Sequence, residues 1–190
     1  MKAALAKHDS ILKDAVESNH GQIIKTTGDG VHAVFEKAND TVNAMLAAQR
    51  KLLEPFENIN IKVRMGAHTG EAELRENDYY GGTLNKAARI MSAGHGGQIL
   101  ISEITHQMAR DYFSKDISTL DLGEHHLKGL LRPERIYQVN APELEQDFPR
   151  LQSLSIKTNN LPQELTSFIG REKEKEEANA LLANTRMLTL

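Results

Sequence analysis

The chain carries a carboxylate at a position typical of a metal-binding turn. Asp29 stands between Gly28 and Gly30, and short runs rich in β-branched residues flank them, a pattern that predicts a β-hairpin over residues 22–35. A carboxylate at such a tip lies beside exposed backbone amides, and Mg²⁺ usually takes one or two carboxylates together with substrate phosphates. Asp-Gly is also the commonest way to build a hairpin turn, so this turn by itself leaves both interpretations open.

Cationic and amide side chains form a second group of candidates. Asn85 and Arg89 are four residues apart in a segment with helical periodicity, so both point the same way. The guanidinium of Arg89 suits phosphate and Asn85 can orient a sugar or phosphate oxygen, with an exposed polar helix face as the alternative. Lys128, in a Leu-Lys-Gly turn, is either a phosphate contact or a solvated lysine. Lys25 and Asp78 could form one polar pair that reads a base edge, although their spacing does not show that they meet.

Other catalytic patterns are missing from the sequence. The eight histidines include no pair with the spacing of a zinc-binding helix, and no Ser/His/Asp order stands out. A phosphate loop of the form Gly-x-x-x-x-Gly-Lys-Ser/Thr is also absent, so the chain is not itself a P-loop enzyme. His68 follows a predicted strand, and we interpret it as structural rather than catalytic.

Composition narrows the class of protein. The 190 residues suffice for one domain plus an appendage, and with 39% hydrophobic but only 5% aromatic residues the core must be aliphatic. A net charge of −3 gives no electrostatic reason to expect nucleic acid or an anionic membrane as partner, and the lack of cysteine excludes disulfides and thiolate metal sites. No apolar run approaches the roughly 18 residues that span a bilayer, and residues 1–9 are too polar for a signal peptide. We expect a soluble, cytoplasmic protein.

Hydrophobic periodicity and turn signals predict an alternation of helices and short strands. Helices are expected over 2–19, from a cap at Asn39 or Asp40 to Leu53, over 82–93 and after a cap at Ser102; strands are expected in the hairpin, over 61–67, 71–75 and 98–101, and as a pair within 117–139. In the helix after Ser102, the side chains expected to face inward are Ile104, Met108 and Tyr112. This order of elements indicates a ferredoxin-like α+β sheet with helices on one face.

Four segments together resemble the class III nucleotidyl cyclase catalytic domain. They are Lys25-Thr-Thr-Gly-Asp-Gly30, Arg64-Met-Gly-Ala-His-Thr-Gly70, Asp78-Tyr-Tyr-Gly-Gly-Thr-Leu-Asn-Lys-Ala-Ala-Arg89 and Leu122-Gly-Glu-His-His-Leu-Lys-Gly129. They follow that family in order and spacing over about residues 3–140, which implies its palm-type form of the ferredoxin-like fold. The chain is similar in particular to bacterial adenylyl cyclase modules that precede an ATPase-type regulator. A diguanylate cyclase is disfavoured, because the Gly-Gly-Asp/Glu-Glu-Phe run of that family is absent.

The resemblance implies how metal and base would be bound. Asp29 matches one of the two aspartates that hold Mg²⁺ or Mn²⁺ in the family. Lys25 and Asp78 match the pair that reads adenine, with the lysine donating to a ring nitrogen and the aspartate accepting from the exocyclic amine. Guanine offers the reverse pattern of donors and acceptors at these edges, so this pair argues for ATP over GTP.

The resemblance also implies a reaction and an assembly. Asn85 matches the residue that orients the ribose, Arg89 the one that stabilises charge on the transferring phosphorus, and Lys128 the lysine that contacts the terminal phosphates. The implied reaction is attack of the ribose 3′-oxygen on the α-phosphate, giving cyclic AMP and pyrophosphate, with metal Lewis acidity and positioned cations as catalysts. In this family the active site lies between two subunits, so a head-to-tail homodimer is implied, with Asp29 serving one site and the other candidates the second.

The resemblance further predicts how the chain is organised. The family begins with a strand of the form Phe-x-Asp-Ile-x-Gly-Ser-Thr, which carries the other metal aspartate, and this sequence begins after it. We therefore expect an N-terminally truncated cyclase domain over 1–140 that is inactive or nearly so by itself, a linker over 141–163, and the start of a truncated ATPase-type domain over 164–190. The alternative is a non-catalytic module that dimerises or binds nucleotide and regulates an attached ATPase.

Overall fold

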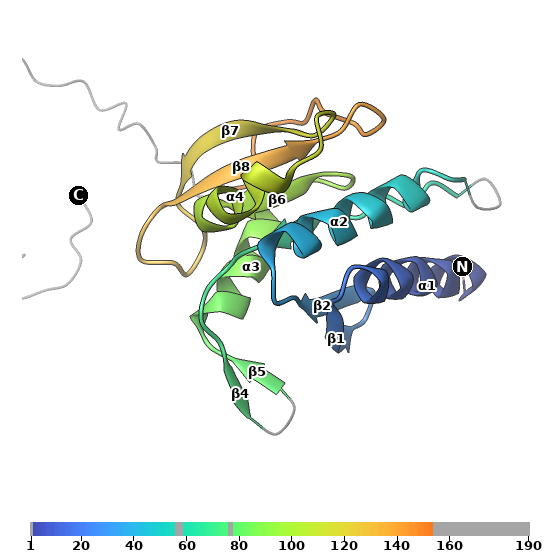
Figure 1. The fold of residues 1–190 in the computed structure, drawn as a ribbon, viewed down its shortest axis with the longest axis horizontal. Helices are drawn as coiled ribbons and strands as arrows, with labels where there is room; N and C mark the ends of the chain where they lie inside the picture. Colours follow the sequence, from blue (N-terminus) through green and yellow to red (C-terminus); the bar gives the residue numbers. More distant parts are fainter. Residues whose placement is uncertain (1, 56–58, 76–77, 154–190) are drawn as a thin grey trace, which may run out of the picture. The chain divides into compact units, whose positions relative to one another are not determined.

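The computed structural model describes residues 2–55, 59–75 and 78–153 (Figure 1). The chain divides into two compact units, Met1–Ile156 and Lys157–Leu190, and the described residues belong to the first. The elements follow in the order α1 (Lys2–Ser18), β1 (Gln22–Thr27), β2 (Gly30–Val34), α2 (Ala38–Leu52), β3 (Met65–Ala67), β4 (Glu73–Arg75), β5 (Asp78–Tyr80), α3 (Gly82–Ala93), β6 (Ile99–Ser102), α4 (Glu103–Ala109), η1 (Arg110–Tyr112), β7 (Ser118–His125) and β8 (Glu134–Asn140). In this part of the chain, no helix combines the length and the apolar character needed to cross a membrane.

Two predicted segments concern residues beyond β8. The ATPase-type start expected over 164–190 and the later part of the expected linker lie outside the described residues. Residues 141–153 have no regular secondary structure, but they pack against the domain, and Ala141 and Leu144 are buried in its core. The chain that follows β8 therefore contributes to the folded unit.

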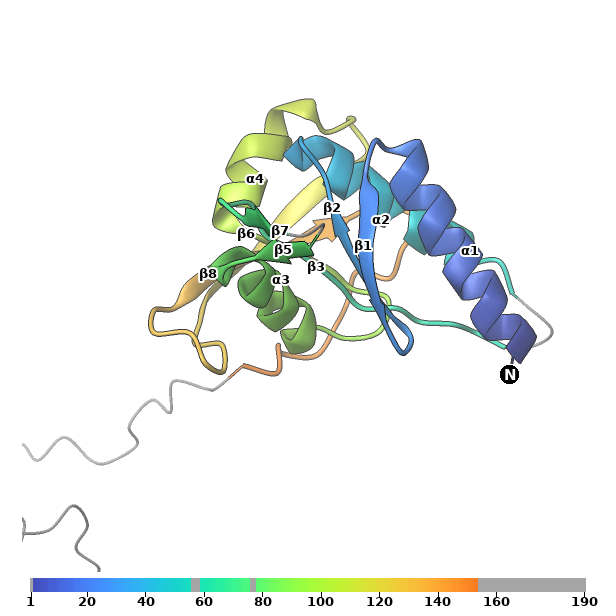
Figure 2. The same ribbon diagram turned by 90° about the horizontal axis from the view of Figure 1, so that it is seen from below.

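The strands of the described residues form a four-stranded sheet and two separate hairpins (Figures 1 and 2). The sheet has the order β3-β6-β8-β7, in which β3 runs parallel to β6, and β8 is antiparallel to both β6 and β7. The hairpins are β1–β2 and β4–β5, each antiparallel. The predicted hairpin over 22–35, helix over 82–93 and strand pair within 117–139 are thereby confirmed.

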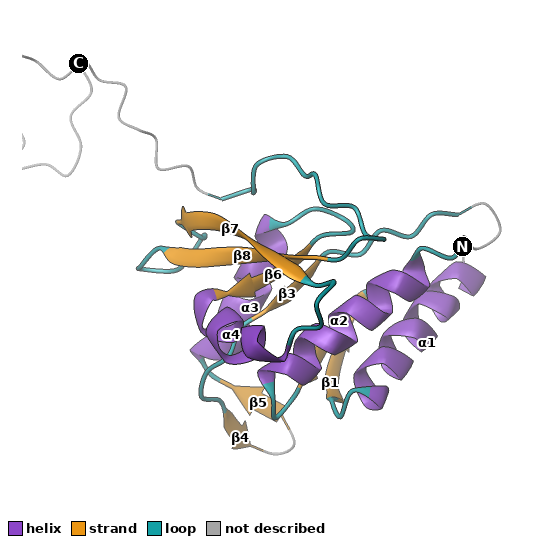
Figure 3. Ribbon diagram, turned by 45° about the horizontal axis from the view of Figure 1, so that its top comes forward, coloured by secondary structure: helices purple, strands orange, loops and turns teal. Residues whose placement is uncertain are grey.

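Strand β6 lies at the centre of the core, because all four of its residues are buried. Ile99 and Ile101 belong to the larger hydrophobic cluster with α1, α2 and α4, whereas Leu100 belongs to a smaller cluster with Ile90 of α3. Since side chains alternate along a strand, α2 and α4 cover one face of the sheet and α3 the other (Figure 3). The α+β class is confirmed. The expected placement of helices on one face holds for α2 and α4. Helix α3 packs on the opposite face, because Leu100 points to that side and contacts the cluster that contains Ile90.

The start of α2 differs from the prediction that Asn39 or Asp40 caps it. The helix begins at Ala38, and its N-cap residue Lys37 makes no side-chain capping hydrogen bond. Asn39 Nδ2 instead donates to Asp40 Oδ1 at 3.0 Å, so these side chains bond each other rather than the helix backbone. Asp40 lies in the first turn, where its negative charge interacts favourably with the helix dipole.

Helix α4 confirms its predicted cap but corrects its predicted inward face. Ser102 Oγ accepts a hydrogen bond from the backbone nitrogen of Thr105 at 3.4 Å. The three side chains expected to face inward are exposed: Ile104 by 48%, Met108 by 54% and Tyr112 by 72%. The buried side of the helix carries Thr105 and Ala109 instead, and these small side chains let α4 lie close to the sheet.

The strand expected over 61–67 is shorter in the structure, where β3 covers only Met65–Ala67. Its ladder partner β6 begins at Ile99, directly opposite Met65, and therefore offers no pairing to the residues before. Val63 still accepts a hydrogen bond on its carbonyl from Gly97 N at 2.9 Å, and its side chain packs against the larger cluster. The alternating pattern thus predicted burial correctly and ladder length wrongly.

Gly66 of β3 lies so close to α3 that a side chain has no room. A Cβ on Gly66 would lie 2.3 Å from the nitrogen and 2.6 Å from the Cα of Met91. We expect Gly66→Ala to lower the free energy of unfolding by about 1–3 kcal/mol, the usual cost of overpacking, as measured by urea unfolding. Gly82→Ala is the control, because a Cβ at Gly82 meets nothing within 4 Å. Equal unfolding midpoints for the two variants would contradict this close approach.

Candidate active site

The β1–β2 hairpin presents Asp29 at its tip. Thr27 pairs with Gly30, which leaves Gly28 and Asp29 as the two turn residues. Gly28 has a φ of 64°, a conformation that glycine adopts without steric cost and that suits a two-residue hairpin turn. Asp29 and Lys25 are both exposed, so this hairpin offers one carboxylate and one ammonium group to solvent or to a ligand.

Helix α3 and the β7–β8 connection bring two predicted phosphate-binding cations to one place. A Cβ on Gly129 would lie 3.7 Å from Arg89 Nη2 and 3.9 Å from Arg89 Nε, so the guanidinium lies beside the backbone of Gly129. Lys128 directly precedes this glycine, and Asn85 lies one helical turn before Arg89. All three side chains are exposed. We call Asn85, Arg89 and Lys128 the cation corner.

An ion pair ties together the two elements that carry the cation corner. Lys86 Nζ lies 2.6 Å from Glu134 Oε1, and the two side chains are only 28% and 18% exposed. Lys86 stands between Asn85 and Arg89 on α3, and Glu134 opens β8 just after the connection that carries Lys128. Because the pair is largely shielded from water, it restrains α3 relative to β8 more than an exposed pair would.

Asp78 lies on a different hairpin from Lys25, its expected partner. It is the first residue of β5, and in the register of the β4–β5 hairpin it stands opposite Arg75. Lys25 lies on β1, which pairs with β2. The base-reading pair of Lys25 and Asp78 stays a prediction.

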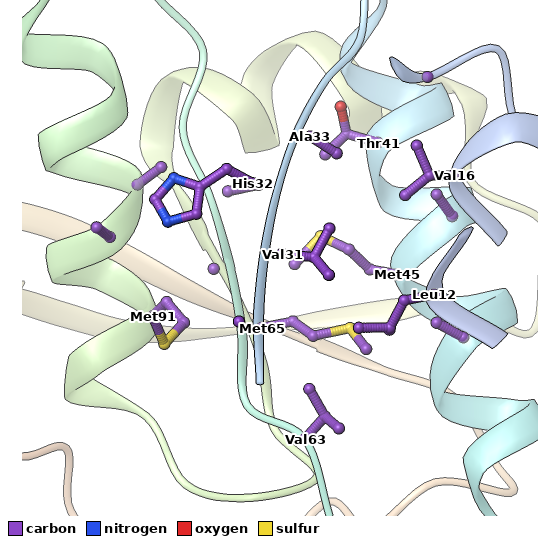
Figure 4. Close-up of a pocket in the computed structure, with 18 of the residues that line it drawn as sticks. Leu12, Val16, Val31, His32, Ala33, Thr41, Met45, Val63, Met65 and Met91 are labelled. Atoms are coloured by element: carbon purple, nitrogen blue, oxygen red, sulfur yellow. The ribbon is translucent and has the colours of Figure 1, made fainter. Parts of the chain in front are cut away.

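A cavity of about 1210 Å³ separates the β1–β2 hairpin from the four-stranded sheet. Its walls come from α1, α2, β2, β3 and α3, and Figure 4 shows Val31 directed toward Met45 of α2 while His32 points toward α3. Among the described residues, β2 pairs only with β1, and β3 only with β6. Asp29 lines this cavity, but Lys25 and the cation corner do not.

His68 takes part in a polar network just beyond β3. Its Nδ1 lies 2.8 Å from Ser102 Oγ, which lies 3.0 Å from Thr105 Oγ1, and Thr69 Oγ1 lies 3.0 Å from the same Thr105 oxygen. Burial lowers the pKa of His68 below its ordinary value of 6.5, and the nearby charge of Lys86 lowers it further, while Glu134 opposes both effects. The imidazole is therefore neutral at physiological pH, and the structural role expected for His68 stays a prediction.

The chemistry of Asp29 fits a divalent cation in part. Mg²⁺ prefers oxygen ligands and commonly takes one or two carboxylates together with substrate phosphates and water. Across residues 2–55, 59–75 and 78–153, no group of three or more His, Cys, Asp or Glu side chains is arranged to hold a metal ion. Asp29 would therefore contribute one carboxylate to a shell that nucleotide phosphates and water complete.

The structure gathers some of the predicted site residues and separates others. Arg89 and Lys128 come together, with Asn85 on the same helix, whereas Asp29 and Lys25 lie on a hairpin outside the main sheet. Sequence reasoning missed the pair of Lys86 and Glu134, whose members are distant along the chain. A lysine between two candidate residues on one helix was the available signal, but nothing in the sequence pointed to its partner.

The sequence matches a known protein family. The adenylate and guanylate cyclase catalytic domain matches residues 1–141, and the chain therefore belongs to this family of class III nucleotidyl cyclases. A solved adenylate/guanylate cyclase/hydrolase from Silicibacter pomeroyi is 29% identical and superposes with a TM-score of 0.66, over 75% of this chain and 85% of that chain. This likeness confirms the ferredoxin-like palm fold expected from the sequence.

Two curated relatives show how far the similarity extends. An uncharacterized protein of Mycobacterium tuberculosis is 36% identical over 178 residues, which cover 92% of this chain and 60% of that protein. A receptor-type adenylate cyclase of Trypanosoma equiperdum is 37% identical over 87 residues, which cover 43% of this chain and 19% of that protein. The chain thus spans at most about 60% of the length of these relatives.

The environment of His68 predicts opposite pKa changes for two substitutions. Since its folded-state pKa is lowered, the neutral form contributes stability that is complete above about pH 6.5 and is lost as the pH falls through the folded pKa. We expect Lys86→Met to raise the pKa of His68 and Glu134→Gln to lower it, as followed by NMR titration of the imidazole. Lys115→Met, which removes an exposed lysine outside this network, is the control. Shifts of the same sign in both variants would contradict the assignment.

Proposed function

We propose that this cyclase domain converts ATP into cyclic AMP and pyrophosphate for intracellular signalling, which implies a cytoplasmic location. The observation that carries the proposal is the cation corner, where the guanidinium of Arg89 lies beside Gly129, the residue that follows Lys128. Two cations and the amide of Asn85 suit a triphosphate and its ribose, because charge-assisted hydrogen bonds to phosphate are among the strongest in proteins. The chain belongs to a family of adenylate and guanylate cyclases, which supports this use of the corner.

The proposed reaction needs charge stabilisation more than covalent chemistry. The ribose 3′-oxygen attacks the α-phosphorus, the bond to the β-phosphate oxygen breaks, and the proton of the 3′-hydroxyl passes to solvent. Arg89 would stabilise the charge that develops on the α-phosphoryl group, Lys128 would hold the terminal phosphates, and Asn85 would orient the ribose. A Mg²⁺ or Mn²⁺ ion at Asp29, when bound, would supply Lewis acidity at the phosphate oxygens.

The preference for ATP rests on Lys25 and Asp78. A lysine donates and an aspartate accepts, which matches the ring nitrogen and the exocyclic amine of adenine and mismatches the corresponding groups of guanine. The similarity to a receptor-type adenylate cyclase of Trypanosoma equiperdum supports the same preference. Replacing the lysine by a hydrogen-bond acceptor and the aspartate by a donor should therefore change whether ATP or GTP binds more tightly.

The placement of Asp29 supports a site shared between two copies of the chain. Asp29 lines the cavity beside the hairpin, and the cation corner lies outside that cavity. A head-to-tail homodimer that brings Asp29 of one subunit to the cation corner of the other would complete two symmetry-related sites. Under this proposal the specific activity rises with protein concentration until dimerisation saturates.

A second candidate function is a non-catalytic module that binds nucleotide and regulates an attached ATPase-type domain. What favours it is the lone carboxylate at the hairpin tip, since the described part of the chain offers no group of three metal-ligating side chains. Such a module would retain affinity for ATP through its cations while it lacks the metal ligands that turnover needs.

The cation corner gives the test of catalysis. With ATP and Mg²⁺ or Mn²⁺, we expect Arg89→Ala to lower kcat by about 100-fold or more, the usual effect of losing a group that stabilises developing charge. Lys128→Ala is expected to raise KM for ATP, because it removes a phosphate contact. Cyclic AMP formation followed by mass spectrometry provides the measurement, and Arg132→Ala, an exposed arginine of the same connection, is the control.

The same assay separates the two candidates. A parallel assay uses the chain preceded by the family's first strand, which carries the second metal aspartate of the family. Turnover in either version that Arg89→Ala abolishes supports the cyclase. Binding of ATP by equilibrium dialysis with no turnover in either version supports the regulatory module, and loss of both activity and binding rejects both proposals.

A further inference from the structure

Residues 141–153, which we call the strap, leave β8 and stay in contact with the domain. Ala141 and Leu144 are buried in the larger hydrophobic cluster. Several polar contacts hold the strap to other elements: Glu143 pairs with Arg50, Lys62 Nζ lies 2.6 Å from Glu145 Oε2, Gln138 Nε2 donates to Gln146 O at 2.7 Å, and His95 Nε2 lies 3.1 Å from Arg150 O. The strap therefore has a defined path rather than that of a loose connection.

The strap ends at the elements that carry the cation corner. Gln152 donates its backbone N–H to the carbonyl oxygen of Ala93, the last residue of α3, at 2.8 Å. Ser153 Oγ lies 2.9 Å from Nδ1 of His125, the last residue of β7. We call Leu151, Gln152 and Ser153 the clasp. It bonds to the last residue of α3 on one side and to the last residue of β7, where the β7–β8 connection begins, on the other.

Directly before these two hydrogen-bonded residues in the chain, Leu151 packs against the smaller hydrophobic cluster. That cluster contains Ile90 and Leu127, which are 0% and 2% exposed. Ile90 follows Arg89 directly, and Leu127 directly precedes Lys128. Each cation of the corner thus stands next to a fully buried residue that belongs to the cluster covered by Leu151.

The positions of the two cations depend on this buried cluster. Arg89 and Lys128 have long, exposed side chains, so their average positions follow the backbone that bears them. Interiors are close-packed, and a side chain removed from their edge lets its neighbours shift. A shift between Ile90 and Leu127 changes the separation of the two charged groups, and small misplacements of binding groups are costly for catalysis.

We propose that the clasp positions Arg89 and Lys128 for phosphate binding, which makes Leu151, Gln152 and Ser153 positioning residues of the cyclase site. The inference rests on the proposed function for its catalytic consequence. Its structural consequence, the relative placement of α3 and the β7–β8 connection, rests only on the contacts of the clasp. Both consequences can be measured separately in the full chain.

The test compares two leucine truncations in the strap. Leu151→Ala is expected to raise KM for ATP, and the Kd for inorganic pyrophosphate by calorimetry, about tenfold with a smaller change in kcat. Leu144→Ala is the matched control, because Leu144 is buried in the larger cluster, away from the cation corner. We expect it to lower the unfolding midpoint at least as much and to leave KM within about twofold. Leu151→Met, which refills the space, should restore KM.

Hydrogen–deuterium exchange supplies a readout that does not depend on catalysis. Leu151→Ala should speed amide exchange in residues 86–93 and 126–131, whereas Leu144→Ala should not. Ser153→Ala, a milder change, should shift KM and exchange in the same direction. If the wild-type chain neither binds nor converts ATP, the proposed function fails and the exchange result alone decides the role of the clasp. Equal exchange and equal KM in Leu151→Ala and Leu144→Ala would overturn the inference.

Discussion

The two hydrophobic clusters of this domain meet across strand β6, which is buried on both faces. Ile99 and Ile101 hold α2 and α4 against one side, and Leu100 holds α3 against the other. The approach of α3 is close enough that only glycine fits at position 66 of the neighbouring strand. Because α3 bears Asn85 and Arg89, this double burial decides where the amide and guanidinium groups of the site stand.

The two exposed cations of the site each stand next to a buried residue in the sequence. Arg89 is followed by Ile90, and Lys128 is preceded by Leu127, so each charged side chain leaves a backbone that the core restrains. The pair of Lys86 and Glu134 adds a further link between α3 and β8.

The acidic part of the site depends on different physics from the cationic part. Asp29 stands on a two-stranded hairpin, and a small hairpin takes its stability from the surface on which it packs. Here α1 contacts β1, and Val31 of β2 packs against the larger hydrophobic cluster. The cation corner, in contrast, is tied to the main sheet, to α3 and to the strap. A dimer that joins an acidic tip to a cation corner would therefore couple a lightly supported element to a rigid one.

Several features of this protein could be predicted from its sequence because they depend on short-range interactions. The Gly28–Asp29 turn, the helix over 82–93, the cap at Ser102 and the spacing of Asn85 and Arg89 each depend on residues a few positions apart, and they match the structure. Tertiary structure decided the rest. Which distant segments meet determines the inward face of α4, the length of β3, the partner of Lys86 and the cluster against which Leu151 packs. Periodicity states that a face is apolar, but only packing of the whole chain determines which face is covered and by what.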